Sequence, residues 1–318
     1  MKTISLPTTG TLTTVPHKAP CLYQSEADFS VILVGTGCPM TVLGRNYPCT
    51  LVRYKSHYFM VDVGDGTAMR LAEGGIPVGD IESIFFTHHH ADHNGGFPYM
   101  LINGWMNGRK KLNLVGPPKT KGYYDFLLKL YEDDIDYRSM GRPEFRAYIH
   151  QSSVREIEDK ETFVLNDVTI STAKLTHSAH NLGYRFEVNG ETIVVSGDTS
   201  YDLALVELAR DADILVMDSG PFPGKEPICA STPYAQGSTP IHKGVPNFQR
   251  MGMGKPRVMP HALPKDVARI AKEANVKTIV LTHMIPNIID EEASLSIFRQ
   301  NGYEGNVVFG RDLLEIIP

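Results

Sequence analysis

A dense run of imidazoles directly after a strand-like segment constrains this chain more than any other feature. The apolar residues 83–86 lead into a His-x-His-x-Asp-His motif made of His88, His90, Asp92 and His93. Side chains alternate along an extended segment, so His88 and His90 would share a face, and a following turn would aim Asp92 and His93 back toward them. Imidazole and carboxylate are ligands that zinc prefers. The run therefore predicts a metal-binding loop and not an accidental polyhistidine stretch.

Further candidate ligands recur downstream, and each follows a predicted strand. They are His177 after residues 168–175, Asp198 after 192–196, and His283 after 277–281. Strand ends gather at one edge of an α/β sheet, so residues distant in sequence can meet there. Five histidines and two aspartates exceed the four ligands of one tetrahedral zinc. They suit two metals about 3.5–4 Å apart. Taken alone, Asp198 would read as a turn residue; the joint occurrence favours a metal site.

Composition narrows the class of protein. The chain has 318 residues, 42% hydrophobic and 21% charged, which is typical of a globular protein with one large α/β domain. A net charge of −5 argues against a nucleic-acid partner. Its four cysteines form no CxxC pair and are expected to be reduced thiols. No signal-peptide pattern and no membrane-length apolar run occurs, so we expect a cytoplasmic protein that makes no contact with a membrane.

The chain divides into an extension, a domain and an insertion. Residues 1–27 are rich in Thr and Pro without a clear period, and residues 28–318 mix strands and helices in both halves, which suits two sheets stacked between helices. Residues 219–260 are dense in Pro and Gly and carry aromatic and Met side chains. Such a stretch is typical of a lid over a site or of a subunit interface. The apolar insertion and the extension together predict a homodimer.

The order of these motifs resembles the metallo-β-lactamase superfamily, and within it the ribonuclease Z and arylsulfatase-like branch. The resemblance covers residues 28–318. It rests on the His cluster and on several short matches: Gly35-Thr36-Gly37, the segment 61–67 (VDVGDGT), His177 six residues before Gly183-Tyr184-Arg185, Gly197-Asp198-Thr199, His261, and Thr282-His283.

This resemblance implies an α/β fold, a four-layer αββα sandwich with a dinuclear metal site at the sheet edges. One metal would take His88, His90 and His177, and the other would take Asp92, His93 and His283. Asp198 would bridge the two. The implied cofactors are two Zn²⁺ ions, although Mn or Fe suits the same ligands. Asp62 resembles a residue that orients the ligands from behind.

The expected chemistry is ester hydrolysis. A water molecule between two zinc ions ionises near neutral pH and becomes the nucleophile. The leaving group still needs an acid, for which His261, oriented by Asp218, is the candidate; together with Asp92 they form the candidate catalytic set. The ribonuclease Z family has a glutamate where Asp218 stands, so the carboxylate here is one methylene shorter. A competing interpretation makes His261 a neighbour of a helix N-cap. His89 and His180 are expected to lie outside the ligand set.

The substrate is expected to be small. Ribonuclease Z enzymes carry a tRNA-gripping arm between the Gly-Tyr-Arg strand and the Gly-Asp-Thr motif, and here a tight Asn189-Gly190 turn leaves no room for it. We therefore expect a hydrolase of small phosphate or sulfate esters, similar to an aryl sulfatase or a phosphodiesterase. The alternatives are a tRNA 3′-processing endonuclease, a lactonase, and a metal-stabilised scaffold or sensor without enzyme activity.

Overall fold

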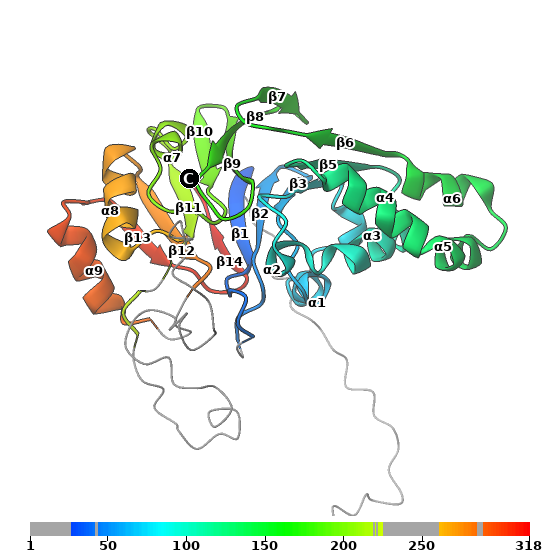
Figure 1. Cartoon of the computed structure of the whole chain (residues 1–318), viewed down its shortest axis with the longest axis horizontal. Coiled ribbons are helices and arrows are strands. Elements are labelled where there is room, and N and C mark those ends of the chain that lie inside the picture. The colour runs from blue at the N-terminus through cyan, green and yellow to red at the C-terminus, as the bar shows by residue number, and fades with distance from the viewer. Residues whose placement is uncertain (1–26, 42–43, 219, 221, 225–260, 285–288) are drawn as a thin grey trace, which may run out of the picture.

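Two seven-stranded mixed sheets form the centre of the fold. The computed structural model describes residues 27–41, 44–218, 220, 222–224, 261–284 and 289–318. The first sheet has the strand order β14-β1-β2-β3-β4-β5-β6 and the second the order β13-β12-β11-β10-β9-β8-β7 (Figure 1). The first is built from Phe29–Gly35 (β1), Cys49–Tyr54 (β2), His57–Val61 (β3), Ser83–Phe85 (β4), Leu112–Gly116 (β5), Ser152–Glu156 (β6) and Leu314–Ile316 (β14). The second is built from Thr162–Leu165 (β7), Val168–Leu175 (β8), Asn181–Val188 (β9), Glu191–Val195 (β10), Ile214–Asp218 (β11), Thr278–Thr282 (β12) and Asn306–Phe309 (β13).

Helices cover the outer face of each sheet, so the predicted four-layer αββα sandwich is confirmed. Figure 1 shows α8 and α9 on one flank and the helices of the first half of the chain on the other. Those on the first sheet are Thr67–Glu73 (α1), Ala91–Asn94 (α2), Phe97–Met106 (α3), Thr120–Leu130 (α4), Glu132–Ser139 (α5) and Pro143–His150 (α6), with a 3-10 turn at Val78–Asp80. Those on the second sheet are Leu203–Leu208 (α7), Pro264–Glu273 (α8) and Glu291–Gln300 (α9).

The central strands are mostly apolar and buried, because both of their faces are covered. Every residue of β1 is buried. Val31 and Leu33 pack into the core between the two sheets, whereas Ile32 and Val34 pack toward the helices. This is the alternation that a pleated strand imposes. The core between the sheets is rich in aromatic side chains, and Phe85 contacts Tyr184 of the opposite sheet edge to face, with ring centroids 5.3 Å apart.

Parallel strand order brings the loops of the site together. In the first sheet β3, β4, β5 and β6 run parallel, and in the second β10, β11, β12 and β13 do so. Their carboxyl ends therefore open on one edge of each sheet. At that edge the N–H of Leu182 in β9 donates to the carbonyl of Thr87 after β4, with N and O 2.9 Å apart. This hydrogen bond ties the two sheets together directly beside the histidine run.

Several predictions on chain organisation lie outside the described residues. The N-terminal extension falls there except for residue 27, and so does the insertion 219–260 except for residues 220 and 222–224. The lid, the subunit interface and the homodimer thus stay predictions. Among the helices that the structure describes, none combines the length and the hydropathy needed to cross a bilayer.

Candidate metal centre

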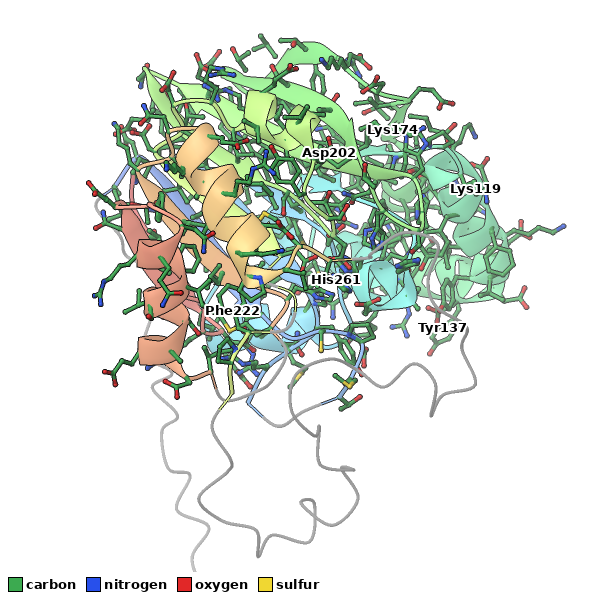
Figure 2. The ribbon with its side chains drawn as sticks, turned by 60° about the vertical axis from the view of Figure 1, so that its left-hand side comes forward. Lys119, Tyr137, Lys174, Asp202, Phe222 and His261 are labelled. Carbon is green, nitrogen blue, oxygen red and sulfur yellow. The ribbon has the colours of Figure 1, made fainter. Side chains whose placement is uncertain are left out.

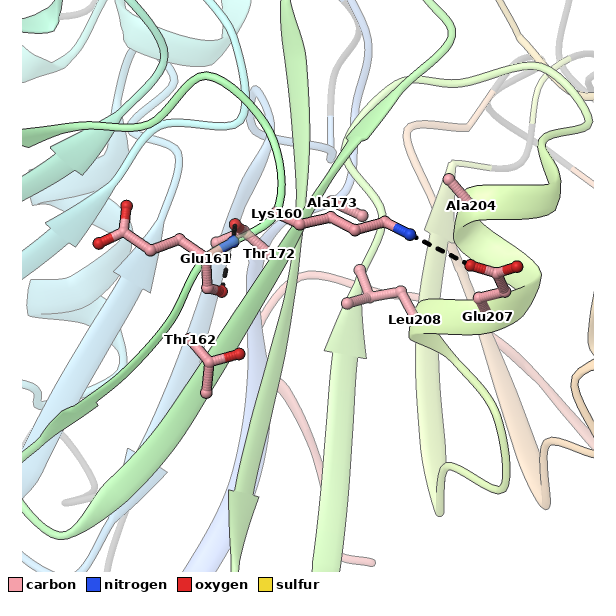
Figure 3. Close-up of a pocket in the computed structure, with 8 residues that line it drawn as sticks. All are labelled: Lys160, Glu161, Thr162, Thr172, Ala173, Ala204, Glu207 and Leu208. Atoms are coloured by element: carbon pink, nitrogen blue, oxygen red, sulfur yellow. Dashed lines mark hydrogen bonds and ion pairs between the residues drawn. The ribbon is translucent and has the colours of Figure 1, made fainter.

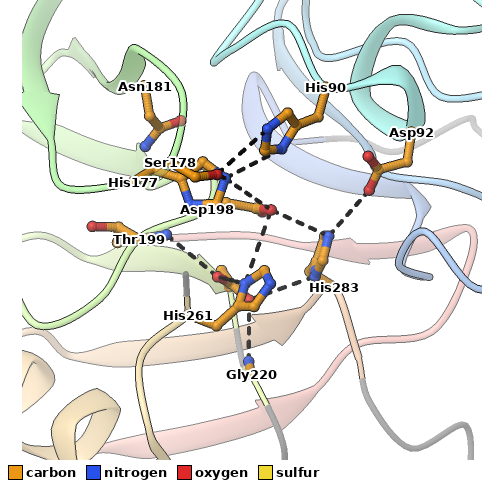
Figure 4. Close-up of polar contacts among 12 residues, drawn as sticks. His90, Asp92, His177, Ser178, Asn181, Asp198, Thr199, Gly220, His261 and His283 are labelled. Atoms are coloured by element: carbon orange, nitrogen blue, oxygen red, sulfur yellow. Dashed lines mark hydrogen bonds and ion pairs between the residues drawn. The ribbon is translucent and has the colours of Figure 1, made fainter. Parts of the chain in front are cut away.

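The structure brings the predicted ligand residues to one place at the edge of the two sheets. The strand β4 ends at Phe85, and the chain then leaves the ladder as a loop that enters the short helix α2. This loop and helix carry four of the seven candidates, and the other three follow β8, β10 and β12 (Figure 4). The seven are His88, His90, Asp92, His93, His177, Asp198 and His283.

One set of ligand-type atoms comes from His88, His90 and His177. The ring centroid of His88 lies 4.5 Å from that of His90 and 4.8 Å from that of His177. The Nε2 atom of His177 is 3.3 Å from Nδ1 of His90. One ligand atom from each of these residues and from Asp198 lies within 4.8 Å of all the others. That spacing suits a single ion between them.

A second set comes from Asp92, His93 and His283. The Oδ2 atom of Asp92 lies 3.4 Å from Nε2 of His283 and 3.5 Å from Nε2 of His93. The two imidazoles are stacked, with ring centroids 5.4 Å apart. The ligand atoms of this set also lie within 4.8 Å of one another. The helix α2 supplies two of its members one residue apart, and His283 arrives from the opposite sheet.

The carboxylate of Asp198 lies between the two sets. Its Oδ2 is 3.9 Å from Nε2 of His177 and 3.4 Å from Nε2 of His283, and its Oδ1 is 3.4 Å from Nε2 of His93. The residue is only 3% exposed. Burial alone would raise the pKa of Asp198, but the neighbouring imidazoles, first those of His283 and His93, lower it well below its usual range. The carboxylate is therefore ionised and faces both sets.

The residues present fit a pair of divalent metal ions. Nε2 of His88, Nε2 of His93 and Oδ1 of Asp198 are buried polar atoms without a hydrogen-bond partner, although buried polar atoms are normally satisfied. All three belong to the cluster of ligand-type atoms. Burial lowers the pKa of His88 well below its ordinary value, which keeps the imidazole neutral, as metal binding requires. Nitrogen and carboxylate donors suit zinc, and also manganese or iron.

Two residues behind the histidines set which ring nitrogen is free. Nδ1 of His93 is 2.7 Å from Oδ2 of Asp62, a bond that leaves Nε2 for a metal. Asp62 also accepts hydrogen bonds from the backbone N–H and the hydroxyl of Thr87, at 2.8 and 2.7 Å. The hydroxyl of Thr87 in turn lies 3.0 Å from Nδ1 of His88. Asp62 was expected in this role; Thr87 was not, although it directly precedes the histidine run.

The histidines that were expected outside the ligand set do lie outside it. His89 turns away from the cluster, where its Nε2 lies 3.1 Å from the hydroxyl of Thr120 and its Nδ1 3.2 Å from the side-chain amide of Asn94. Nδ1 of His180 lies 3.9 Å from a carboxylate oxygen of Glu158. Neither histidine shares the groups of ligand-type atoms found in the described part of the chain.

The proposed acid and its partner are in direct contact. Nδ1 of His261 lies 2.6 Å from Oδ2 of Asp218, the last residue of β11. His261 precedes α8 (Figures 2 and 4), and the N-cap of that helix is Leu263, without a side-chain hydrogen bond. His261 therefore lies two residues before the N-cap, as the competing interpretation expects, and its ring also contacts Asp218. Burial would lower the pKa of His261, but the charge and hydrogen bond of Asp218 outweigh it and raise the pKa to about 9.

Asp218 also contacts the metal cluster. Its Oδ1 lies 3.6 Å from Nδ1 of His283 and accepts a hydrogen bond from the backbone N–H of Gly220 at 3.1 Å. The rings of His261 and His283 are stacked, with centroids 5.0 Å apart. One carboxylate thus holds the proposed acid beside a candidate metal ligand. Because the chain ends β11 with this residue, the shorter aspartate reaches both imidazoles without the extra methylene of a glutamate.

A hydroxyl that the sequence analysis did not single out lies at the cluster. Oγ of Ser178 is 3.5 Å from Nε2 of His90 and 3.5 Å from Nε2 of His177 (Figure 4). Its position directly after His177 was the only sign in the sequence that it could lie at the cluster.

The cavity of about 300 Å³ shown in Figure 3 is elsewhere, between β7, β8 and α7, and none of the seven candidate ligands lines it.

Known proteins share both the sequence pattern and this fold. Residues 29–223 match the family model described as anti-Pycsar protein Apyc1. The ribonuclease Z of Mycobacterium marinum is 30% identical over 291 residues, which cover 89% of this chain and 96% of that protein. The ribonuclease Z of Mycolicibacterium paratuberculosis is also 30% identical, with the same shares covered. The chain belongs to the ribonuclease Z branch of the metallo-β-lactamase superfamily and to the Apyc1 family.

Solved structures agree on the fold. The metallo-β-lactamase fold protein YhfI from Bacillus subtilis has a TM-score of 0.65 at 14% identity, and covers 91% of this chain and 98% of its own. Human tRNase Z, short form, has a TM-score of 0.62 at 19% identity over the same shares. A diphosphatase from the PhnP family has a TM-score of 0.58 at 16% identity, over 91% and 97%. As a member of this superfamily branch the chain is a metal-dependent hydrolase of ester bonds.

Proposed function

We propose that this chain is a dinuclear zinc hydrolase of small phosphate or sulfate esters, and of phosphodiesters above all. One observation carries the proposal: the ionised carboxylate of Asp198 lies within 4.0 Å of imidazoles from both ligand sets. A carboxylate placed in this way suits two ions that share it as a bridge. Phosphorus is preferred over sulfur because the relatives named above include ribonuclease Z enzymes and a diphosphatase.

The residues can divide the reaction between them. When bound, two ions would supply a water molecule that ionises near neutral pH and positive charge for the oxygens of the substrate. His88, His90 and His177 would hold one ion, and Asp92, His93 and His283 the other. His261 is held through Nδ1 by Asp218, which leaves Nε2 to donate a proton to the departing oxygen. A raised pKa keeps His261 protonated at neutral pH, as an acid must be.

A tight turn supports a small substrate. The strands β9 and β10 pair directly as a hairpin, with Asn189 at φ 53° and Gly190 at φ 84° in the turn between them. Two residues with positive φ are the signature of a tight two-residue connection. An arm that grips tRNA would have to leave the fold at this point, and the hairpin provides no place for it. The net charge of −5 also lacks the basic surplus that binding to a phosphate backbone favours.

The second candidate is a tRNA 3′-processing endonuclease. It is favoured by the 30% identity to proteins named ribonuclease Z over almost their whole length. The ligand pattern is compatible with both functions, so only the substrate distinguishes them. The two proposals therefore differ in what must fit above the metals and not in the chemistry at the metals.

A substrate panel on the purified, zinc-loaded protein tests the proposal. We expect two zinc ions per chain by elemental analysis and turnover of bis(p-nitrophenyl) phosphate above that of p-nitrophenyl sulfate and of a γ-lactone. Asp198→Asn should abolish this turnover and His89→Ala should retain it, because His89 faces Thr120 and not the cluster. Cleavage of precursor tRNA with a higher kcat/KM than that of the diester would favour the endonuclease. Fewer than two ions per chain would overturn the dinuclear site.

A further inference from the structure

We propose that Asp312 is a positioning residue for the metal ligand His283, acting through Thr36; this rests on the proposed dinuclear site. Asp312 lies between β13 and β14, and its side chain is only 6% exposed. Its Oδ1 accepts hydrogen bonds from the backbone N–H of Thr36 at 3.0 Å and from the hydroxyl of Thr36 at 2.7 Å. Its Oδ2 accepts one from the N–H of Asn46 at 2.6 Å and lies 3.3 Å from Nη2 of Arg70. One buried carboxylate thus fixes the loop that follows β1.

That loop holds the backbone next to His283. The carbonyl of Thr36 accepts a hydrogen bond from the N–H of Met284 at 2.9 Å. His283 has φ 53°, in the left-handed region that a residue with a Cβ atom adopts only at a cost in free energy. Residues in such conformations persist where their surroundings hold them. The hydrogen bond from the N–H of Met284 to the carbonyl of Thr36 restrains the backbone in this way, one residue after the candidate ligand.

Arg45 reinforces the same contact point. Its Nη1 donates to the hydroxyl of Thr36 and to the carbonyl of Gly310, both at 2.8 Å. Gly310 is joined to β12 by its N–H, which donates to the carbonyl of Leu281 at 2.9 Å. The loop after β1, the end of β12 and the segment before β14 are therefore cross-linked around Thr36. His283 leaves β12 directly from this junction, so its ring position depends on how firmly the junction is held.

Replacement of Asp312 by asparagine is a sharp test because every acceptor position of the carboxylate is used. Thr36 donates to one oxygen, and Asn46 and Arg70 face the other. Whichever way an amide is turned, its NH₂ group meets N–H or O–H donors, so at least one contact to the loop is lost. The shape of the side chain is otherwise unchanged.

Glu315 offers a matched control in the same C-terminal segment. Its Oε1 accepts a hydrogen bond from the hydroxyl of Ser30 at 2.7 Å and lies 3.1 Å from Nη2 of Arg53, and its side chain is 18% exposed. Like Asp312, it ties the chain end to the first sheet with a largely buried carboxylate. Ser30, however, precedes Thr36 by six residues of extended chain, about 20 Å at 3.3 Å per residue. Glu315→Gln therefore perturbs the chain end without touching the junction at Thr36.

Zinc affinity of the chelator-stripped, full-length protein is the measurement, with a chromophoric chelator as competitor. We expect Asp312→Asn to weaken one of the two zinc sites roughly 10-fold, in the range seen for residues that orient ligands, and to leave the other within about 2-fold. Glu315→Gln should leave both sites unchanged. Thr36→Val removes the two hydrogen bonds of the hydroxyl but keeps the backbone N–H contact to Asp312 and the volume, and it should shift the same site by less. In a His283→Ala background, Asp312→Asn should have no further effect on zinc binding.

The results separate the possible failures. If wild-type protein binds two ions and Asp312→Asn matches it, or if both sites weaken equally, Asp312 is only a structural clamp and the proposal is overturned. An equal shift with Glu315→Gln would overturn it as well. If the wild type itself binds fewer than two ions, the proposed dinuclear function falls and the positioning role falls with it. Should Asp312→Asn not fold, the same comparison is made with Thr36→Val, where unchanged zinc affinity overturns the proposal.

Discussion

The hydrogen bond between Asp218 and His261 makes a quantitative prediction about leaving groups. Asp218→Asn removes the charge that holds the pKa of His261 at about 9, against an ordinary value of 6.5. What remains is burial and the charge of His93, which lower the pKa, against the charge of Asp198, which raises it, so we expect the pKa of His261 in the variant to return toward its ordinary value of 6.5. At pH 8 the protonated fraction is about 0.9 for a pKa of about 9 and about 0.03 for a pKa of 6.5. The fraction of enzyme molecules in which His261 is protonated, and can act as the acid, therefore falls about 30-fold.

The loss should depend on the leaving group. An alkoxide needs a proton as it departs, whereas p-nitrophenolate is stable without one. We therefore expect kcat at pH 8 for a methyl p-nitrophenyl diester cleaved at the aryl bond to change little, and kcat for a dialkyl or nucleoside diester to fall about 30-fold. The alkaline limb of the pH profile for the alkyl substrate should move to lower pH, because the group that must stay protonated has a lower pKa in the variant.

Two controls show whether the effect of Asp218→Asn on activity acts through His261: the zinc content of each preparation and a double variant. Asp218 also lies 3.6 Å from Nδ1 of His283, so each preparation is compared at equal zinc content. His261→Ala should show the same selectivity for leaving groups, and the double variant with Asp218→Asn should lose little more than His261→Ala alone, since the two residues act as one unit. An equal loss for aryl and alkyl leaving groups at full zinc content would refute the assignment of His261 as the acid.

Further predictions follow from other contacts. Asp198→Asn should reduce the bound zinc from two ions to one or none by elemental analysis, and two retained ions would contradict a bridging carboxylate. His89→Ala should keep both ions and lose about 1 kcal/mol of unfolding free energy for its hydrogen bonds; a loss of metal would show that it is a ligand. Gly64→Ala places a Cβ 2.7 Å from the carbonyl of Asp92 and should cost about 1–3 kcal/mol by thermal unfolding. Gly122→Ala in α4, which meets nothing within 4 Å, should not destabilise the protein.

The sandwich could be predicted because its strands are buried on both faces. Such strands read as short apolar runs in the sequence, and β8 occurs at residues 168–175, where a strand was expected. The elements that the sequence did not indicate are those with little burial of their own. The helix α5 (EDDIDYRS) buries only Ile135 and Ser139, so it has no apolar period to detect. The strand β14 has three residues and is defined by its pairing with β1.

The ligand-type residues of the site could be predicted for a different reason. Each follows a strand or opens a helix, so its place along the chain fixes its place at the sheet edge. Spacing alone also separated His89 from its neighbours, because alternation turns it toward Thr120. Whether these residues bind metal stays a prediction, which the zinc measurements above test. Their convergence, by contrast, follows from the order of the strands.

The residues that orient the ligands follow no such rule. Thr87 contributes one hydroxyl between Asp62 and His88, and Asp312 reaches the site from the far end of the chain through Thr36. No periodicity or motif marks these positions, because a hydrogen bond depends on loop geometry within a few tenths of an ångström. The local sequence therefore identifies the candidate ligands, whereas the positions of their side chains depend on hydrogen bonds between distant parts of the fold. Substitution of a residue that orients a ligand, such as Thr87 or Asp312, should preserve the metal-binding motif and still lower metal affinity.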